Sequence, residues 1–303
     1  MPETMLSVRS TSAMSDYGNQ DPEWPGVDWR AHLRRVELPG AEVNYVEIGE
    51  GEPIVFVHGI SGSWHNWLEN LPHFGRTHRA IALDLPGFGA SPMPSWPIDV
   101  PAYGRLIHDF CEKLGIEGGT IVGNSLGGFI AAEAITATPG RFERLALVSA
   151  AGIVNTWNPE ERAVATAFAW KTFSPYFARG GREIVNRPRL RRAVFGPFVR
   201  YPNRLGAQLL WEQIDGGLTN CPGFGEALHA AIHHDIRERL GTIEIPTLIL
   251  WGFNDRVIPV QAALSYHRRI PHSRLEIFER TGHVPQLERP ARFNAILDDF
   301  VTG

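Results

Sequence analysis

The chain has 303 residues, of which 43% are hydrophobic and 20% charged, and its formal net charge is −4. This length accommodates one large α/β domain or a domain that carries an insertion, and the composition is that of an ordinary globular protein. The small net charge gives no electrostatic reason to expect a nucleic-acid partner or an anionic membrane surface. No apolar stretch approaches the ~20 residues that span a bilayer, and the first residues show no signal-peptide pattern. We therefore expect a cytoplasmic protein without stable membrane insertion.

Residues 1–38 are polar and rich in Pro, Ser and Asp, with Trp24 and Trp29 as large apolar side chains. This composition predicts an N-terminal extension, disordered at first, that packs through the tryptophans. Nothing in it points to chemistry.

From residue 39 onward, short apolar runs alternate with amphipathic segments. The runs end in turn residues, which is typical of strands buried on both faces of a parallel sheet. The predicted strands cover 41–49, 53–59, 80–87, 119–125, 145–152, 246–252 and 273–279, and the predicted helices cover 103–115, 126–140 and 290–301. This alternation predicts an α/β fold with a mostly parallel central sheet and helices on both faces.

Residues 153–238 differ from the rest because they contain no buried-strand run and are rich in aromatic residues and arginine, notably in "NRPRLRR". Helical stretches are expected at 159–174, 203–215 and 225–239. We interpret this segment as a mostly helical cap, inserted between two parts of the core at 39–152 and 239–303.

The stretch "GNSLGG" at 123–128 places Ser125 between Gly123 and Gly127, directly after a predicted buried strand. Such spacing is typical of a nucleophile elbow, in which glycines let the chain turn sharply and expose the serine hydroxyl. The alternative is a plain strand-to-helix turn in which glycine only relieves crowding.

Two further residues follow strands of the same sheet. Asp255 comes after the strand at 246–252, and His283 comes after the strand at 273–279. Taken singly, each has an ordinary alternative, a helix-capping aspartate or a surface histidine. Because functional groups of an open parallel sheet gather at the carboxyl ends of its strands, the order Ser, Asp, His predicts a catalytic triad.

An oxyanion hole is expected from the backbone N–H groups of Ile60 and Leu126. Ile60 follows "HG" at the end of a strand, and Leu126 opens the helix after Ser125, where the helix dipole adds partial positive charge. His58 itself is interpreted as structural, with its ring bonded to nearby loops.

The motifs "HGISGS", "DLPGFGAS", "GNSLGG", "WGFNDRVIP" and "GHVPQLERP" occur in this order along the chain. Together they resemble the α/β-hydrolase superfamily, in the serine-nucleophile group with an inserted helical cap. The resemblance covers about 40–152 and 240–303. It implies hydrolysis through an acyl-enzyme with Ser125, Asp255 and His283 as catalytic residues, a supporting role for Asp84, and no cofactor or metal.

The apolar cap favours a carboxylic ester with an apolar acyl or alcohol group, as in carboxylesterases and lipases. Carbon–carbon bond hydrolysis of a vinylogous diketone from ring cleavage is the alternative. "GNSLGG", "DLPGFG" and "HNW" resemble that family, and cap arginines (Arg189, Arg191 or Arg192) could pair with a dienoate carboxylate. The preferred interpretation of this arginine run is a solvated helix face. That family usually has Gly-Pro-Gly where this chain has Ile-Ser-Gly, and tryptophan where it has Val284. Perhydrolase and lactonase activities also stay open, as does a non-catalytic receptor on the same fold.

The remaining reactive side chains suggest no further chemistry. Cys111 and Cys221 form no C-x-x-C pair, and Cys111 lies in a predicted amphipathic helix. His229, His233 and His234 have a spacing that can bind zinc, but no third ligand type completes a pattern, and we expect cap residues instead. A small-molecule substrate is the expected partner, and a homodimer is left open.

Overall fold

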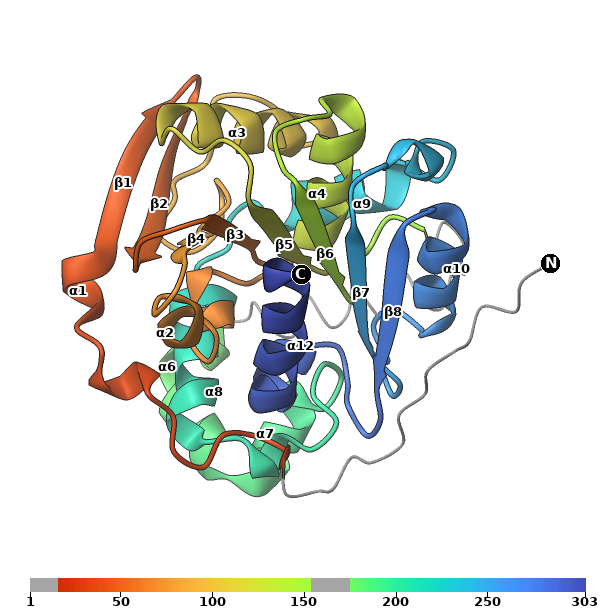
Figure 1. Ribbon diagram of the computed structural model, residues 1–303. Helices are drawn as coiled ribbons and strands as arrows, with labels where there is room; N and C mark the ends of the chain where they lie inside the picture. The colour runs from red at the N-terminus through yellow and green to blue at the C-terminus, as the bar shows by residue number, and fades with distance from the viewer. Residues whose placement is uncertain (1–15, 154–174) are drawn as a thin grey trace.

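The computed structural model describes residues 16–153 and 175–303 (Figure 1). Eight strands form one sheet in the order β1-β2-β4-β3-β5-β6-β7-β8. β1 and β2 pair antiparallel, β2 is also antiparallel to β4, and all other neighbours are parallel. The strands are β1 (Leu33–Leu38), β2 (Ala41–Ile48), β3 (Pro53–Val57), β4 (Arg79–Leu83), β5 (Thr120–Asn124), β6 (Arg144–Val148), β7 (Thr247–Gly252) and β8 (Ser273–Phe278). The predicted mostly parallel α/β sheet is confirmed.

The sheet separates two apolar layers because successive side chains of a strand point to opposite faces. Along β3, Val55 and Val57 join one buried cluster, and Ile54 and Phe56 join the other. The first cluster includes residues of α3 (Val100–Lys113), α4 (Leu126–Ala137) and α10 (Gln261–Arg269). The second includes residues of α2 (Leu71–Phe74) and α12 (Pro290–Thr302), so helices cover both faces (Figure 1).

The N-terminal segment differs in part from its prediction, because residues 33–38 form the edge strand β1. Leu38 is its one buried residue, and the exposed side chains explain why no apolar run marks this strand in the sequence. Before β1 come a 3₁₀ turn at Trp24–Gly26 and the short helix α1 (Trp29–His32). Trp24 is buried, as the packing through tryptophan requires.

Between β6 and β7 the described residues are mostly helical, and below we use the name cap only as a label for residues 175–238. This part contains α6 (Pro175–Asn186), α7 (Pro188–Phe195), α8 (Ala207–Gln213), a π-helical turn at Ile214–Leu218 and α9 (Phe224–His233). α8 lies within the predicted stretch 203–215, and α9 begins one residue before the predicted stretch 225–239 and ends six residues before its end, whereas 159–174 falls outside the described residues. No helix was expected at α6, which contains the glycine pair Gly180-Gly181. The arginine run lies in α7 with Arg189 and Arg192 exposed, as a solvated helix face requires.

Short helices also flank the motif loops. They are 3₁₀ turns at Trp64–Trp67, Pro202–Arg204 and Leu240–Thr242, and α11 (Pro285–Glu288). Within 16–153 and 175–303, no helix is both long and apolar enough to cross a bilayer. Cys111 and Cys221 are buried free thiols, and burial raises the pKa of each to about 12.

Candidate active site

Ser125 occupies a strained turn between β5 and α4, with φ 56° and ψ −117°. A Cβ on Gly123 would lie 2.3 Å from the carbonyl oxygen of Gly127, and a Cβ on Gly127 would lie 2.2 Å from that of Val57. Only glycine permits these approaches. The Ser125 hydroxyl makes no capping hydrogen bond to α4. The turn therefore has the geometry of a nucleophile elbow.

Asp255 and His283 lie in the loops after β7 and β8 and are in direct contact. Nδ1 of His283 donates to Oδ2 of Asp255 at 2.8 Å, because a carboxylate only accepts. The other oxygen, Oδ1, accepts the N–H groups of Val257 and Ile258 at 2.8 and 2.9 Å. Both side chains are buried. This arrangement fixes the imidazole tautomer and leaves Nε2 free to accept a proton.

The loop that carries His283 lies beside the elbow. The side-chain amide of Asn124 donates to the carbonyl oxygen of Val148 at 3.1 Å and to that of His283 at 3.3 Å. The backbone N–H of His283 donates to the carbonyl oxygen of Phe198, from the cap, at 2.6 Å. The structure thus joins Asp255 to His283 and ties the histidine loop to the residue before Ser125. Among the described residues, no hydrogen bond links the Ser125 hydroxyl to His283.

The two predicted oxyanion donors border the same turn. A Cβ on Gly59 would lie 3.0 Å from Cβ of Ser125, so the chain that enters Ile60 runs against the elbow. Leu126 is the first residue of α4, and its N–H therefore has no acceptor within the helix. These positions are compatible with hydrogen bonds from both backbone N–H groups to a substrate oxygen beside Ser125.

His58 connects two strand ends through backbone hydrogen bonds. Its Nε2 accepts the N–H of Leu85 at 2.9 Å, so Nδ1 carries the proton and donates to the carbonyl oxygen of Gly59 at 2.7 Å. Burial, partly offset by the bond to Gly59, lowers the pKa of His58 to about 4. Both ring nitrogens are used, which agrees with the expected structural role.

Asp84 directly follows β4 and supports the loops that follow β3 and β4. Its carboxylate accepts hydrogen bonds from the backbone of Trp64 at 2.7 Å, the backbone of Ala90 at 2.9 Å and the side chain of Asn44 at 2.9 Å. Burial raises its pKa to about 6, against the lowering effect of these hydrogen bonds. All of its contacts are internal, so Asp84 acts as a brace.

A contact that the sequence reading missed joins the cap to the loop after β3. The side chain of Gln213 donates to the carbonyl oxygen of His65 at 2.8 Å and accepts from the amide of Asn66 at 2.8 Å. Beside it, a Cβ on Gly217 would lie 2.7 Å from the carbonyl oxygen of Ser61. The π-helical turn that contains Gly217 therefore packs closely on the loop that contains Ile60, and π-turns often occur at functional sites. In the sequence, the glycine pair Gly216-Gly217 is the feature that could have predicted this close contact between the two backbones.

A second missed residue is Glu288, which is fully buried behind the His283 loop. Its Oε1 accepts the N–H of Gly282 at 2.8 Å and that of Val284 at 3.4 Å. Its Oε2 accepts the hydroxyl of Tyr17 at 2.5 Å and the N–H of Arg200 at 2.7 Å. Burial raises the pKa of Glu288 to about 7, although the hydrogen bonds oppose this change. The carboxylate thus holds the histidine loop, the cap and the N-terminal segment together.

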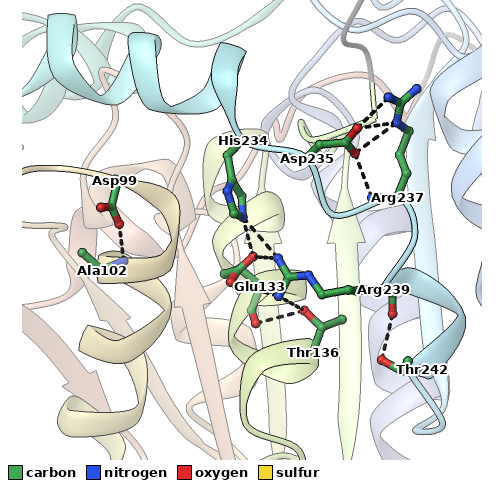
Figure 2. Close-up of polar contacts among 9 residues, drawn as sticks. All are labelled: Asp99, Ala102, Glu133, Thr136, His234, Asp235, Arg237, Arg239 and Thr242. Atoms are coloured by element: carbon green, nitrogen blue, oxygen red, sulfur yellow. Dashed lines mark hydrogen bonds and ion pairs between the residues drawn. The ribbon is translucent and has the colours of Figure 1, made fainter.

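Figure 2 shows a polar cluster away from Ser125, in which Glu133 of α4 forms hydrogen bonds with His234 and Arg239, both from the segment that follows α9. His234 Nε2 lies 2.7 Å from Oε2 of Glu133, and Arg239 donates to the same oxygen at 2.5 Å. His229 and His233 stack on each other with ring centroids 4.1 Å apart. Within the described ranges, no group of three or more histidine, cysteine, aspartate or glutamate side chains could hold a metal ion.

Comparison with known proteins agrees with this architecture. A 2-hydroxy-6-oxo-2,4-heptadienoate hydrolase from Pseudomonas putida is 30% identical over 288 residues, which cover 89% of this chain and 96% of the relative. An acetyltransferase component of the acetoin cleaving system from Cupriavidus necator is 28% identical and is covered to 71% of its length, with 91% of this chain matched. Among solved structures, a meta-cleavage product hydrolase from Pseudomonas fluorescens has a TM-score of 0.71 at 26% identity, over 88% of this chain and 96% of that chain.

A membrane phospholipase A also has a TM-score of 0.71, at 26% identity, and the match covers 89% of this chain and 87% of that chain. The family model for the alpha/beta hydrolase fold matches residues 52–290, which include the elbow and the loops after β7 and β8. The chain therefore belongs to the α/β-hydrolase family.

Proposed function

We propose that the protein is a serine hydrolase that cleaves a carboxylic ester with an apolar acyl or alcohol group. The observation that carries the proposal is the buried hydrogen bond between Asp255 and His283, beside a serine on a strained turn. A histidine with Nδ1 bound to a carboxylate and Nε2 free is suited to act as a general base.

In the proposed reaction, the residues act as follows. The Ser125 hydroxyl oxygen attacks the ester carbonyl carbon, and its proton passes to Nε2 of His283. The negative charge that develops on the carbonyl oxygen is stabilised by the N–H groups of Ile60 and Leu126, each contributing roughly 3 kcal/mol if well aligned. The protonated His283 then gives its proton to the leaving alcohol. A water molecule, deprotonated by His283, hydrolyses the acyl-enzyme and releases the acid.

The ester preference rests on the apolar surroundings of the histidine. The ring of Phe198, from the cap, lies 6.5 Å from the imidazole of His283, centroid to centroid. Val284 follows His283 and is buried, and Ile60 packs against the core. Such surroundings favour an apolar group next to the scissile bond. The likeness to a phospholipase supports the same substrate class.

Hydrolysis of p-nitrophenyl esters from acetate to laurate tests this proposal. We expect turnover with a chain-length optimum, and a fall in kcat of at least ~10³-fold in Ser125→Ala. Ser149→Ala is the matched control, because Ser149 is also buried, follows the neighbouring strand β6 and has φ 47°. Equal loss in both variants, or turnover that survives Ser125→Ala, would contradict the assignment of Ser125.

Carbon–carbon bond hydrolysis is the second candidate, favoured by the relative that is named as a 2-hydroxy-6-oxo-2,4-heptadienoate hydrolase. The same catalytic residues would serve this reaction, so only the activity on each substrate can distinguish the two candidate functions. We would follow the loss of the dienoate chromophore with the same variants. Serine-dependent cleavage of the dienoate at a kcat/KM well above that of every ester would replace the ester proposal. If neither substrate is turned over, failure of a fluorophosphonate to label Ser125 would reject the triad and favour a non-catalytic role.

A further inference from the structure

A cavity of about 390 Å³ opens at the surface between the cap and the loop after β7. None of Ser125, Asp255 and His283 is among the residues that line it. The described residues that line it include Arg192, Arg200, Tyr201, Pro202, Arg204 and Arg256. This lining contains four arginines and, among the described residues, no acidic side chain. The cavity is thus strongly positive.

The charges of these arginines are not balanced within the described part of the chain. None of the four forms an ion pair there, whereas Arg237, Arg239 and Arg274 all pair with carboxylates. The neighbouring Arg191 is also different, since its guanidinium donates to the carbonyl oxygens of Val185 and Leu205. Four like charges around one space repel each other, and an anion in that space would remove the repulsion.

Arg200 gives a second, independent indication of a ligand. Its Nε is buried and has no hydrogen-bond partner among the described residues, while Arg200 as a whole is half-buried. Its guanidinium lies over the ring of Tyr201, 5.1 Å from the ring centroid, and this contact orients the group. A buried N–H donor without an acceptor is costly, and native proteins generally satisfy such groups with a protein, water or ligand acceptor.

From the cavity, its four arginines and the unpartnered donor, we propose that this is a binding site for a small molecule that carries a phosphate group. Guanidinium groups pair bidentately with phosphate oxygens, and a cluster of them is suited to a doubly charged anion. The cavity has the size of a small-molecule site, so the ligand is an organic phosphate and not the inorganic ion alone. Pro202 provides an apolar wall for the organic part.

The site is close to the catalytic loops without being part of them. Arg200 donates its backbone N–H to Glu288, and the carbonyl oxygen of Phe198 accepts the N–H of His283. Residues 198–200 therefore connect the proposed phosphate site with the histidine loop. Arg256, which also lines the cavity, directly follows Asp255. The proposal does not depend on the ester substrate, and its test uses binding alone.

Isothermal titration calorimetry with phenyl phosphate tests the proposal, at constant pH and at an ionic strength held with NaCl. We expect saturable binding, and a loss of about tenfold or more in affinity for Arg192→Gln and for Arg204→Gln, because each removes a charge-assisted hydrogen bond. Both side chains are exposed, so the variants should fold. Arg105→Gln, at an exposed position of α3, is the matched control and should bind like the wild type.

Three results would overturn the proposal. They are the absence of binding, an equal loss in Arg105→Gln and Arg204→Gln, and heats that persist when sodium chloride replaces phenyl phosphate as the titrant at equal ionic strength. Inorganic phosphate serves as the second ligand. If it binds as tightly as phenyl phosphate, the organic part of the proposal is wrong and the cavity is a site for the free ion.

Discussion

The two carboxylate oxygens of Asp255 accept hydrogen bonds from different groups. Oδ2 accepts from His283 Nδ1, while Oδ1 accepts two backbone N–H groups of its own loop. These backbone hydrogen bonds therefore orient the carboxylate toward the imidazole. This leaves the carboxylate one function toward the histidine, which is to hold the proton on Nδ1.

For Asp255→Asn we expect a fall in kcat of ~10³ to 10⁴-fold for ester hydrolysis. The amide can still accept from the loop through one oxygen, but its NH₂ group then faces Nδ1 and favours the tautomer with the proton on Nε2. That tautomer cannot accept the serine proton. Steady-state kinetics with a p-nitrophenyl ester measure the effect, and the midpoint of thermal unfolding shows whether the fold is kept.

Asp235→Asn is the control, because Asp235 lies on the surface and pairs with Arg237. It should retain wild-type kcat. A kcat for Asp255→Asn within tenfold of the wild type would show that the carboxylate is not needed to orient the base.

Helix α4 begins at the elbow and is tied at its other end to the segment that leaves the cap. Glu133 has a side chain that is 4% exposed, and it pairs with His234 and Arg239 (Figure 2). Burial opposes ionisation of this carboxyl, but the hydrogen bonds from Arg239 and His234 outweigh it and lower the pKa of Glu133. The cluster thus stabilises the junction between the α9 end and the core.

Glu133→Gln should lower the free energy of unfolding by ~1 to 3 kcal/mol at neutral pH, because it removes charge-assisted hydrogen bonds from a buried position. Arg239 is 38% exposed and can turn to water, so the cost stays below that of an isolated buried charge. Since the folded-state pKa of Glu133 is depressed, its contribution is present above the carboxyl's ordinary pKa and is lost as the pH falls. Urea denaturation at pH 7 and pH 4 measures both effects.

Arg237→Gln is the matched control for this cluster. Arg237 and Asp235 are 40% and 38% exposed, and such surface pairs contribute ~0 to 1 kcal/mol. If Glu133→Gln costs no more than Arg237→Gln, the cluster does not stabilise the junction.

Glu288 connects three parts of the molecule that are distant in sequence. Tyr17 comes from the N-terminal segment, Arg200 from the cap and Gly282 from the histidine loop, and all three donate to this carboxylate. Gly18 adds a backbone hydrogen bond to the carbonyl oxygen of Glu288 at 2.8 Å. The N-terminal segment is therefore anchored to the residue that braces the candidate base.

The pH dependence of stability should report on this carboxyl. Its folded-state pKa is raised to about 7, so the folded protein holds the proton more tightly than the unfolded chain does. The stabilisation is fully present below the ordinary glutamate pKa and is lost as the pH rises to about 7, by an amount of the order of 3 kcal/mol. Relative to the wild type, Glu288→Gln should therefore become more stable as the pH rises from 4.5 to 7.5.

The wild type must be compared with the variant because buried histidines change the free energy of unfolding with pH in the opposite direction to Glu288. The pKa of His58 is lowered by burial, so its contribution is lost as the pH falls. Glu117→Gln, at an exposed position, is the control and should leave the pH profile of the free energy of unfolding unchanged. A constant difference between wild type and Glu288→Gln across this pH range would contradict the raised pKa.

Much of this protein could be predicted from local sequence. The strands at 53–57, 120–124 and 247–252 are apolar runs that end in turn residues, and a buried strand requires no more than that. The glycines around Ser125 predicted the elbow because the tight turn is itself a local property. The positions of Asp255 and His283 followed from strand ends, since parallel strands bring their carboxyl ends to one edge.

Tertiary structure decided what depends on distant residues. The sequence gives no sign that Tyr17 reaches Glu288, which is 271 positions away, or that Gln213 docks on the loop after β3. The edge strand β1 is mostly exposed and so carries no apolar signal, and the arginine cavity arises only when residues 192–204 meet Arg256. Periodicity and turns record the conformation of neighbouring residues, whereas buried carboxylates, cap contacts and charged cavities depend on long-range packing that no short segment encodes.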